Sequence, residues 1–180
     1  MSIMQQVILT FIFLLITGCA QAPKVLRYDA SHHLYYLNGD LDSNSYQEIA
    51  ELLANNQYTP VTIVARSNGG KLVGLEGAMD AIRSHGHVYW VVPSYSHCYS
   101  ACAVLGLSAS KIDGTLYFHS IFSSYKNTTF QLMGRNESVM NRLISYGYDK
   151  NMIEQLFKSV NIYKKLRFKE GVLQQEDGDQ

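Results

Sequence analysis

The sequence lacks excess charge and is poor in proline and cysteine. Its 15 Lys and Arg residues balance 15 Asp and Glu residues over 180 positions, and the basic residues are scattered. The chain therefore lacks the electrostatic footprint of a nucleic-acid-binding protein, and we expect no nucleic acid as a partner. Three prolines beside 13 tyrosines and 7 phenylalanines argue against an unstructured chain and indicate a packed, ordered domain.

The apolar run near the N-terminus is too short to be a membrane span. It covers residues 7–16, with Thr10 as its one polar residue, whereas a spanning helix needs about 20 apolar residues. Thr17, Gly18 and Cys19 follow the run, and a cysteine placed directly after small residues resembles the bacterial lipobox. We expect a lipoprotein signal peptide over residues 1–18 and lipidation of Cys19.

One feature of this segment departs from a typical signal peptide. Residues 1–6 contain no Lys or Arg, so the alternative is an uncleaved hydrophobic anchor. Either alternative predicts an exported protein. The lipoprotein signal further predicts a protein at the periplasmic side of a bacterial cell envelope, anchored by its N-terminal lipid to the outer rather than the inner membrane. Residues 19–24 would then form a short lipidated tether.

The other two cysteines form a pair. Cys98 and Cys102 are four residues apart, a spacing that puts them on one face of a helix with Cα atoms about 6 Å apart. An oxidising compartment permits a disulfide between them. The alternative is two small buried thiols. A thiol redox role is weaker, because the spacing is four rather than three.

Apolar runs and helical stripes alternate along the rest of the chain. The predicted strands cover residues 34–37, 61–65, 87–92 and 115–118, and the predicted helices cover residues 43–56, 72–84, 100–110, 136–146 and 150–166. This order predicts one α/β domain over residues 25–168, with a mostly parallel sheet flanked by helices. Residues 120–134 are polar and would form a lid over a pocket. Residues 169–180 are expected to be an acidic, disordered tail.

Three predicted strands end beside residues that could take part in catalysis. These ends lie at the edge of the sheet where α/β proteins place their binding and active sites. These residues are Gly69 with Gly70, Ser100 and His119. Glycine lets backbone amides approach an oxygen that becomes negative in a transition state. The alternative is a tight turn. Lys71, without a Gly-Lys-Ser/Thr ending, argues against a nucleotide-binding loop.

Ser100 is expected to open a helix rich in small residues, which include Ala101, Ala103 and Gly106. The positive field at a helix N-terminus favours a developing anion, and the Ala101 amide is a second oxyanion donor. The alternative for Ser100 is an ordinary helix cap. His119 ends an apolar strand, and its alternative is a structural histidine bonded to a carbonyl.

Together these motifs resemble the Clp protease proteolytic subunit and crotonase superfamily. The resemblance rests on Ser-Asn-Gly-Gly at 67–70, Cys-Tyr-Ser-Ala-Cys at 98–102 and His119, and it spans about residues 34–161. The Cys-X-Ser-Ala-Cys run is similar to a periplasmic, uncharacterised branch of Clp-like proteins. The resemblance implies a ClpP/crotonase-like spiral fold.

The resemblance also implies the roles of individual residues. Ser100 would be the nucleophile and His119 the general base, while Gly69 or Gly70 together with Ala101 would donate the oxyanion N–H groups. Peptide or protein substrates are expected, because an exported protein meets no acyl-CoA pool. The sequence leaves open whether the chain forms a homo-oligomer, since related folds form rings or trimers.

The third member of the triad is where the sequence departs from the family. Aligning residues 154–156 with the corresponding Clp helix puts Ser159 where the family has its orienting acid. Asp149 is the nearest acidic alternative and Glu154 is another. The chain would therefore use a dyad, use Asp149, or be an inactive binding or scaffold protein of the cell envelope.

A metal site is a further alternative. His85, His87, His97, Cys98 and Cys102 lie close in sequence and are of the types that bind zinc. The first two histidines precede a predicted strand and the third follows it, about 20 Å away along an extended chain. We therefore expect neither a metal nor another cofactor.

Overall fold

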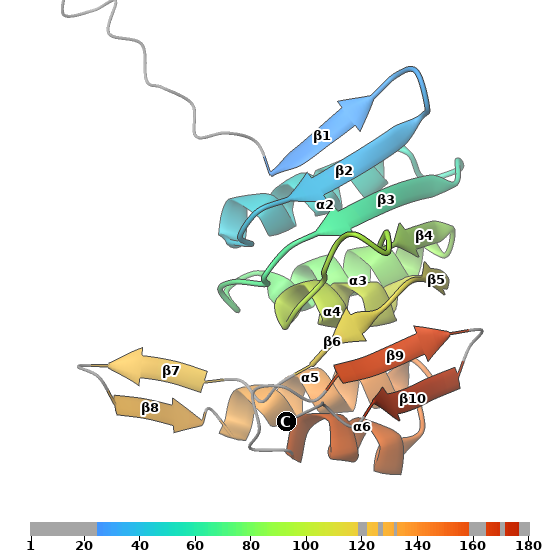
Figure 1. The fold of residues 1–180 in the computed structure, drawn as a ribbon. Helices are drawn as coiled ribbons and strands as arrows, with labels where there is room; N and C mark the ends of the chain where they lie inside the picture. The colour runs from blue at the N-terminus through green and yellow to red at the C-terminus, as the bar shows by residue number, and fades with distance from the viewer. Residues whose placement is uncertain are drawn as a thin grey trace, which may run out of the picture.

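The main sheet has five strands in the order β1-β2-β3-β4-β5 (Figure 1). The computed structural model describes residues 25–118, 122–125, 128–131, 133–158, 165–169 and 172–176. The strands are β1 Leu26–Asp29, β2 Leu34–Asn38, β3 Val61–Arg66, β4 Val88–Val91 and β5 Lys111–Asp113. β1 pairs with β2 in antiparallel fashion, and β2 through β5 are parallel. The prediction of an α/β domain with a mostly parallel sheet is confirmed.

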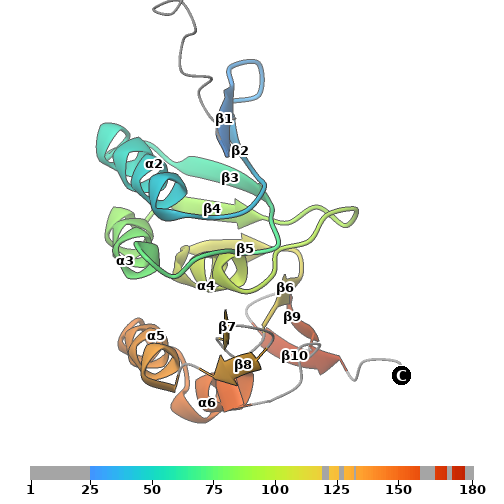
Figure 2. The same ribbon diagram turned by 90° about the vertical axis from the view of Figure 1, so that its left-hand side faces the viewer.

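Three helices cover one face of this sheet, namely α2 Ser43–Asn55, α3 Leu75–His85 and α4 Ala101–Ser108 (Figure 2). In β3 the side chains of Val61, Ile63 and Ala65 are buried against the helices, whereas Thr62 and Val64 are only half-buried. The continuous apolar run predicted a strand buried on both faces. That expectation was wrong, because the second face carries no helix among the described residues.

Local sequence explains which face of helix α2 is buried and where the helix begins. Its apolar stripe of Tyr46, Ile49, Leu52 and Leu53 is buried, as the periodicity predicts. Its N-cap is Asp42. The Asp42 carboxylate accepts a hydrogen bond from the Ser45 amide at 2.9 Å, which completes a capping box and lowers the pKa of Asp42.

Helix α4 lies in the centre of the core, with all eight of its residues buried. Gly106 permits this position, because a Cβ there would lie 3.0 Å from Leu116 and 3.1 Å from the Trp90 ring. The small residues of this helix therefore let it pack closely against neighbouring strands.

The C-terminal part of the chain adds a second layer below the main sheet (Figure 1). β6 Leu116–Tyr117, β9 Lys165–Lys169 and β10 Val172–Glu176 form a three-stranded sheet, and β7 Phe122–Tyr125 pairs with β8 Thr128–Gln131. The helices of this layer are α5 Met133–Ser145 and α6 Lys150–Lys158.

Several sequence predictions fail in this layer. The short strand β5 completes the main sheet, whereas the strand expected at 115–118 belongs to the second sheet as β6. β7 and β8 occupy part of the segment expected to be irregular. The helix expected over residues 150–166 gives way to strand β9, which begins at Lys165, and residues 172–176 form β10 where a disordered tail is expected. Strand pairing with distant residues, which local patterns do not report, decides these segments.

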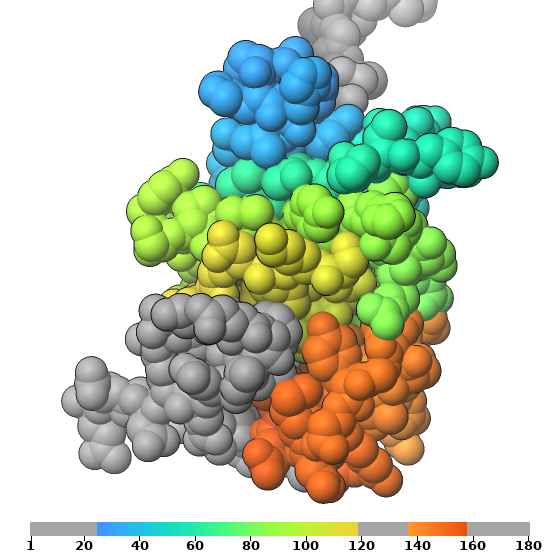
Figure 3. Space-filling model, turned by 90° about the vertical axis from the view of Figure 1, so that its right-hand side faces the viewer, coloured from blue at the N-terminus to red at the C-terminus, as the bar shows by residue number. Residues whose placement is uncertain are grey.

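A polar cluster ties α5 to α3. The Arg142 guanidinium pairs with Asp80 and, at 3.0 Å, with Glu76, while the Tyr146 hydroxyl donates to Asp80 at 2.7 Å. Burial raises the pKa of the Asp80 carboxyl, but the hydrogen bonds from Tyr146 and Arg142 outweigh burial and lower it overall. In Figure 3 the orange atoms of α5 and α6 form the lower part of the molecule, packed beneath the segments that precede them.

Within the described ranges, none of the helices combines the length and the apolar character that crossing a membrane requires. The predicted signal peptide, the lipidation site Cys19 and the tether lie outside the described residues.

Candidate active site

The loops that follow β3 and β4 pair with each other at the carboxyl edge of the sheet. Ser67 donates its amide to the His97 carbonyl at 2.9 Å, and the Tyr99 amide donates to the Ser67 carbonyl at 2.9 Å. Beyond β3 and β4 the two segments also form a parallel bridge between Ser67 and Cys98. It therefore brings the predicted glycine turn next to the predicted nucleophile.

The same segment pairs on its other side with β6. The Tyr117 amide donates to the Cys98 carbonyl at 3.0 Å, and the Ser100 amide donates to the Tyr117 carbonyl at 2.9 Å. Three chain segments, after β3, after β4 and in β6, thus meet at Ser100. β6 leads to His119, which lies outside the described residues.

Ser100 has a backbone conformation that side chains other than glycine rarely adopt. Its φ is 55° and its ψ is −121°, and it directly precedes the first residue of α4. Such a conformation costs about 1–3 kcal/mol and persists only where the surroundings enforce it. An ordinary N-cap serine has extended dihedrals and a side chain bonded to the helix, whereas Ser100 makes no capping hydrogen bond. Ser100 is partly exposed, and its strained geometry is typical of a nucleophile at a sharp strand-to-helix turn.

Gly69 packs directly against the serine. A Cβ at Gly69 would lie 2.7 Å from both the Ser100 Cβ and the Tyr99 carbonyl oxygen, and 3.1 Å from the Ala101 amide nitrogen. The φ of Gly69 is 92°, so both the space and the backbone require glycine here. Its own amide donates to the Ser67 hydroxyl at 3.0 Å and is therefore already bonded.

Gly70, on the other side of the turn, lies close to the backbone of Leu41. The Leu41 amide donates to the Gly69 carbonyl at 2.7 Å, and the Lys71 amide donates to the Leu41 carbonyl at 2.8 Å. A Cβ at Gly70 would lie 1.9 Å from that carbonyl oxygen. Among the hydrogen bonds of the described residues, none uses the amide of Gly70 or of Ala101. These two amides therefore have no partner among the described residues.

The buried hydroxyl of Ser67 holds the turn. It donates to the Gly39 carbonyl at 2.6 Å while accepting from the Gly69 amide. Sequence reasoning treated this serine only as part of a motif. Its place between a buried strand and two glycines is the signal that predicts such an anchoring role.

A disulfide joins Cys98 and Cys102, which lie on either side of Ser100 in the sequence. The Cys98 and Cys102 sulfur atoms lie 2.00 Å apart, and both residues are fully buried. Of the two sequence alternatives, the structure therefore shows the disulfide. The expected geometry was wrong, because Cys98 lies in the extended segment before the helix and only Cys102 is helical. The positive φ of Ser100 lets the chain turn back so that the two sulfurs meet.

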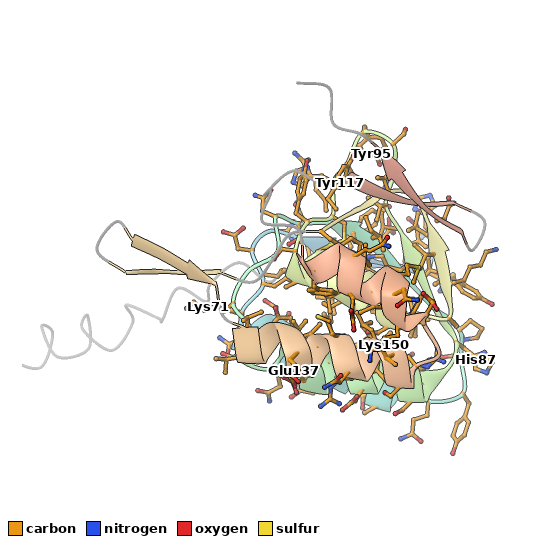
Figure 4. All side chains as sticks on the ribbon, turned by 90° about the horizontal axis from the view of Figure 1, so that it is seen from below. Lys71, His87, Tyr95, Tyr117, Glu137 and Lys150 are labelled. Atoms are coloured by element: carbon orange, nitrogen blue, oxygen red, sulfur yellow. A yellow bond between two sulfur atoms is a disulfide. The ribbon has the colours of Figure 1, made fainter. Side chains whose placement is uncertain are left out.

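The acidic candidates for the third triad position would lie beside His119, which is outside the described residues, so their role stays a prediction. Asp149 is exposed and caps α6, where its carboxylate accepts from the Met152 amide at 2.9 Å. The adjacent Tyr148 donates to the Leu107 carbonyl at 2.7 Å, near the end of α4 opposite to Ser100, and an eight-residue helix is about 12 Å long. In Figure 4 Lys150, which follows Asp149, lies toward His87 and away from Lys71.

The remaining candidates add no acid at this site. Glu154 pairs with Lys150 at 3.8 Å within α6. Ser159 lies outside the described residues.

The histidines and cysteines considered for a metal site are not assembled into one. The His85 Nε2 donates a hydrogen bond to the Asn56 carbonyl at 2.9 Å, and the His97 ring packs on Tyr99. The two cysteines are joined to each other. In the described part of the chain, no group of three or more His, Cys, Asp or Glu residues is arranged to hold a metal ion.

No family model matches the chain, and no curated protein matches it in sequence. Its structure is similar to that of the 1510-N membrane-bound stomatin-specific protease in a serine-to-alanine mutant form. The TM-score is 0.52 at 14% identity, over 68% of this chain and 67% of that chain. A lysine-to-alanine mutant of that protease in complex with a substrate peptide gives a TM-score of 0.51 at 15% identity, over 68% and 64% of the two chains.

The chain is also similar to the ClpP protease catalytic domain from Plasmodium falciparum, with a TM-score of 0.51 at 14% identity over 68% of this chain and 71% of that chain. At such low identity these likenesses show the fold alone. The expected ClpP-like fold is therefore confirmed.

Proposed function

We propose that this chain is a serine hydrolase that cleaves peptide bonds, with Ser100 as nucleophile. The observation that carries the proposal is the backbone of Ser100, held at a φ of 55° against Gly69. A strained, partly exposed serine beside two unbonded amides combines a nucleophile with preorganised donors.

Each residue has a defined role in the proposed reaction. The Ser100 hydroxyl attacks the carbonyl carbon of the substrate and transfers its proton to His119. The carbonyl oxygen becomes an oxyanion that accepts hydrogen bonds from the Gly70 and Ala101 amides. His119 then returns the proton to the leaving amine, and water hydrolyses the acyl-enzyme. One such oxyanion donor is worth a factor of about 10²–10³ in kcat.

Peptide bonds are favoured over thioesters for two reasons. An exported protein meets no acyl-CoA pool, and the proteins of similar structure are proteases by their names. A disulfide beside the nucleophile fits an oxidising compartment. A homo-oligomer is also proposed, as in related folds, and light scattering of the purified protein would measure its mass.

Export and lipidation form a separate part of the proposal, resting on the sequence of residues 7–19. We expect Cys19, once the signal peptide is removed, to anchor the protein at the periplasmic side of the outer membrane. The Cys19→Ala variant should leave the membrane fraction, and the intact mass of the native protein should lack residues 1–18. A variant that stays membrane-bound and retains these residues would instead indicate the uncleaved anchor.

Labelling with a fluorophosphonate probe tests the nucleophile directly. We expect the wild-type protein to be labelled, Ser100→Ala to lose all labelling, and His119→Ala to label about 10²–10⁴-fold more slowly because the base is absent. Ser110→Ala is the matched control. Its hydroxyl donates to the Val88 carbonyl at 2.8 Å, just beyond the other end of α4.

The second candidate is a binding protein that keeps the pocket and does not hydrolyse. The capping role of Asp149 favours it, because the carboxylate of this candidate acid already accepts a hydrogen bond from the Met152 amide. A folded wild-type protein that resists labelling at high probe concentration would support the binding protein and refute the hydrolase.

A further inference from the structure

A small pocket adjoins the glycine turn. Its volume is about 290 Å³, near the lower limit for ligand pockets. Its lining residues are Asn38, Gly39, Arg66, Ser67, Asn68 and His97. We propose that this pocket is a specificity subsite that binds a carboxylate of the peptide substrate, an inference that rests on the proposed function.

The pocket lies within a few residues of the nucleophile. Asn68 directly precedes Gly69, which packs on Ser100. His97 is three residues before Ser100, a distance of about 10 Å in extended chain. An extended peptide reacting at Ser100 would therefore reach the pocket with a side chain or terminus within about three residues of the bond that is cleaved.

Most of the lining side chains, including Arg66 and Asn68, lie on the helix-free face of the sheet. Successive side chains of an extended chain alternate between faces, so Arg66 and Asn68 point away from the side taken by the buried Ser67. His97 and Tyr99 likewise flank the buried Cys98.

A row of rings connects the pocket to the site. The His97 and Tyr99 ring centroids lie 5.2 Å apart, and those of Tyr99 and Tyr117 lie 4.6 Å apart. Figure 4 shows Tyr117 on the same side of the molecule as Tyr95, opposite Glu137 of α5. The row therefore runs along the helix-free face from the pocket to β6, the strand that precedes His119.

The chemistry of the lining selects a group that accepts hydrogen bonds. Arg66 is exposed and forms no ion pair with any described acidic residue, and the side chains of Asn38, Asn68 and His97 form no hydrogen bond to described residues. Guanidinium, amide and imidazole groups all offer N–H donors, and a carboxylate offers only acceptors. Arg is suited to a bidentate carboxylate.

No acidic residue lines the pocket, so nothing in its lining competes for Arg66. The larger groove of about 670 Å³ that shares Asn38 and Arg66 contains Asp29. That carboxylate is already bonded to the Ser31 amide and to His32, each at 2.9 Å, and the Ser31 hydroxyl holds its pKa well below the usual range. In Figure 3 the segment after β4 stands out at the left edge of the molecule, below the blue β1–β2 hairpin that borders this groove.

The test measures binding in the Ser100→Ala protein, so that it does not depend on hydrolysis. Fluorescein-labelled random hexapeptide pools carry either a fixed Glu or a fixed Gln and end in an amide. Two further pools lack acidic side chains and end in a free carboxylate or an amide. The first comparison detects an acidic side chain and the second a C-terminal carboxylate.

We expect one carboxylate pool to bind about 10- to 100-fold more tightly than its amide counterpart, since hydrogen bonds to charged groups contribute about 1.5–3 kcal/mol each. Arg66→Gln should remove this preference, and Arg66→Lys should keep part of it. Arg27→Gln removes the same charge from the neighbouring groove and should keep the whole preference.

Equal binding of all pools would overturn the subsite. An equal loss of the carboxylate preference in Arg27→Gln and Arg66→Gln would also overturn it, because it would indicate diffuse electrostatic attraction. Fluorophosphonate labelling of the wild-type protein is scored separately. Labelling without carboxylate preference refutes only the subsite, and carboxylate preference without labelling refutes only the hydrolase.

Discussion

Removing the disulfide should slow the reaction of Ser100 as well as destabilise the fold. Cys98 and Cys102 flank the strained serine on both sides, and their bond closes a loop of five residues around it. We consider the double variant Cys98→Ala/Cys102→Ala, because alanine keeps both buried positions apolar and leaves no free thiol.

The magnitudes follow from the loop length and the backbone strain. Closing a five-residue loop stabilises a protein by about 2 kcal/mol in the chain-entropy treatment. The conformation of Ser100 costs about 1–3 kcal/mol, which is of similar size. Without the bond, relaxed conformers compete, and 2 kcal/mol corresponds to a roughly 30-fold smaller reactive population. The same 2 kcal/mol lowers the Tm of a domain of this size by about 4–8 °C.

The assay compares the second-order rate of fluorophosphonate labelling with the Tm of the same preparations. We expect labelling at 25 °C, where both proteins are folded, to slow by about 10- to 30-fold. The hydrogen bond from the Ser100 amide to Tyr117 remains and limits the loss. A variant with a lowered Tm and an unchanged labelling rate would refute this reasoning, because the bond would then stabilise only the fold.

Two further predictions concern the turn and the helix layer. Gly69→Ala should abolish labelling, since the new methyl group would lie 2.7 Å from the Ser100 Cβ and displace either the turn or the serine. The circular dichroism spectrum should remain that of a folded protein. Asp80→Asn should lower the Tm near neutral pH, and this deficit should shrink below about pH 4. The folded pKa of Asp80 is lowered, so its pairing with Arg142 contributes stability above the unfolded pKa and loses it as the pH falls.

Each of these predictions has a contrary result. Normal labelling of Gly69→Ala would show that the turn does not contact the reactive serine. A Tm difference between wild type and Asp80→Asn that stays constant from about pH 7 to about pH 3 would show that the carboxylate charge does not hold α5.

The sequence patterns that predicted structure correctly are those that depend on neighbouring residues. The stripe of Tyr46, Ile49, Leu52 and Leu53 predicted α2, because helical periodicity and burial require only neighbouring residues. Short apolar runs separated by helices predicted the parallel sheet. The prediction that Gly69 belongs beside Ser100 rested on a resemblance in motif order, and the close approach of the two residues agrees with it.

The failures come from segments whose partners are far away in sequence. β5 is three residues long, and it becomes a strand only because β4 offers it an open edge. The start of β9 is expected to be helical and β10 to lie in a disordered tail, yet β9 pairs with both β10 and β6, and both segments are strands. Asp149 is predicted as an orienting acid from its place in the sequence; it caps α6, and its role toward His119 stays a prediction because His119 lies outside the described residues.

By itself, the order of residues determined the fold class, the helical stripes and the set of groups that could do chemistry, because these depend on periodicity and residue type. Only the tertiary structure decided the positive φ of Ser100, the partner of Cys98 and the gathering of Arg66, Asn68 and His97 around one pocket. Those features arise where loops from separate strands pair at the sheet edge, and the free energy of that pairing is set by contacts between residues distant along the chain.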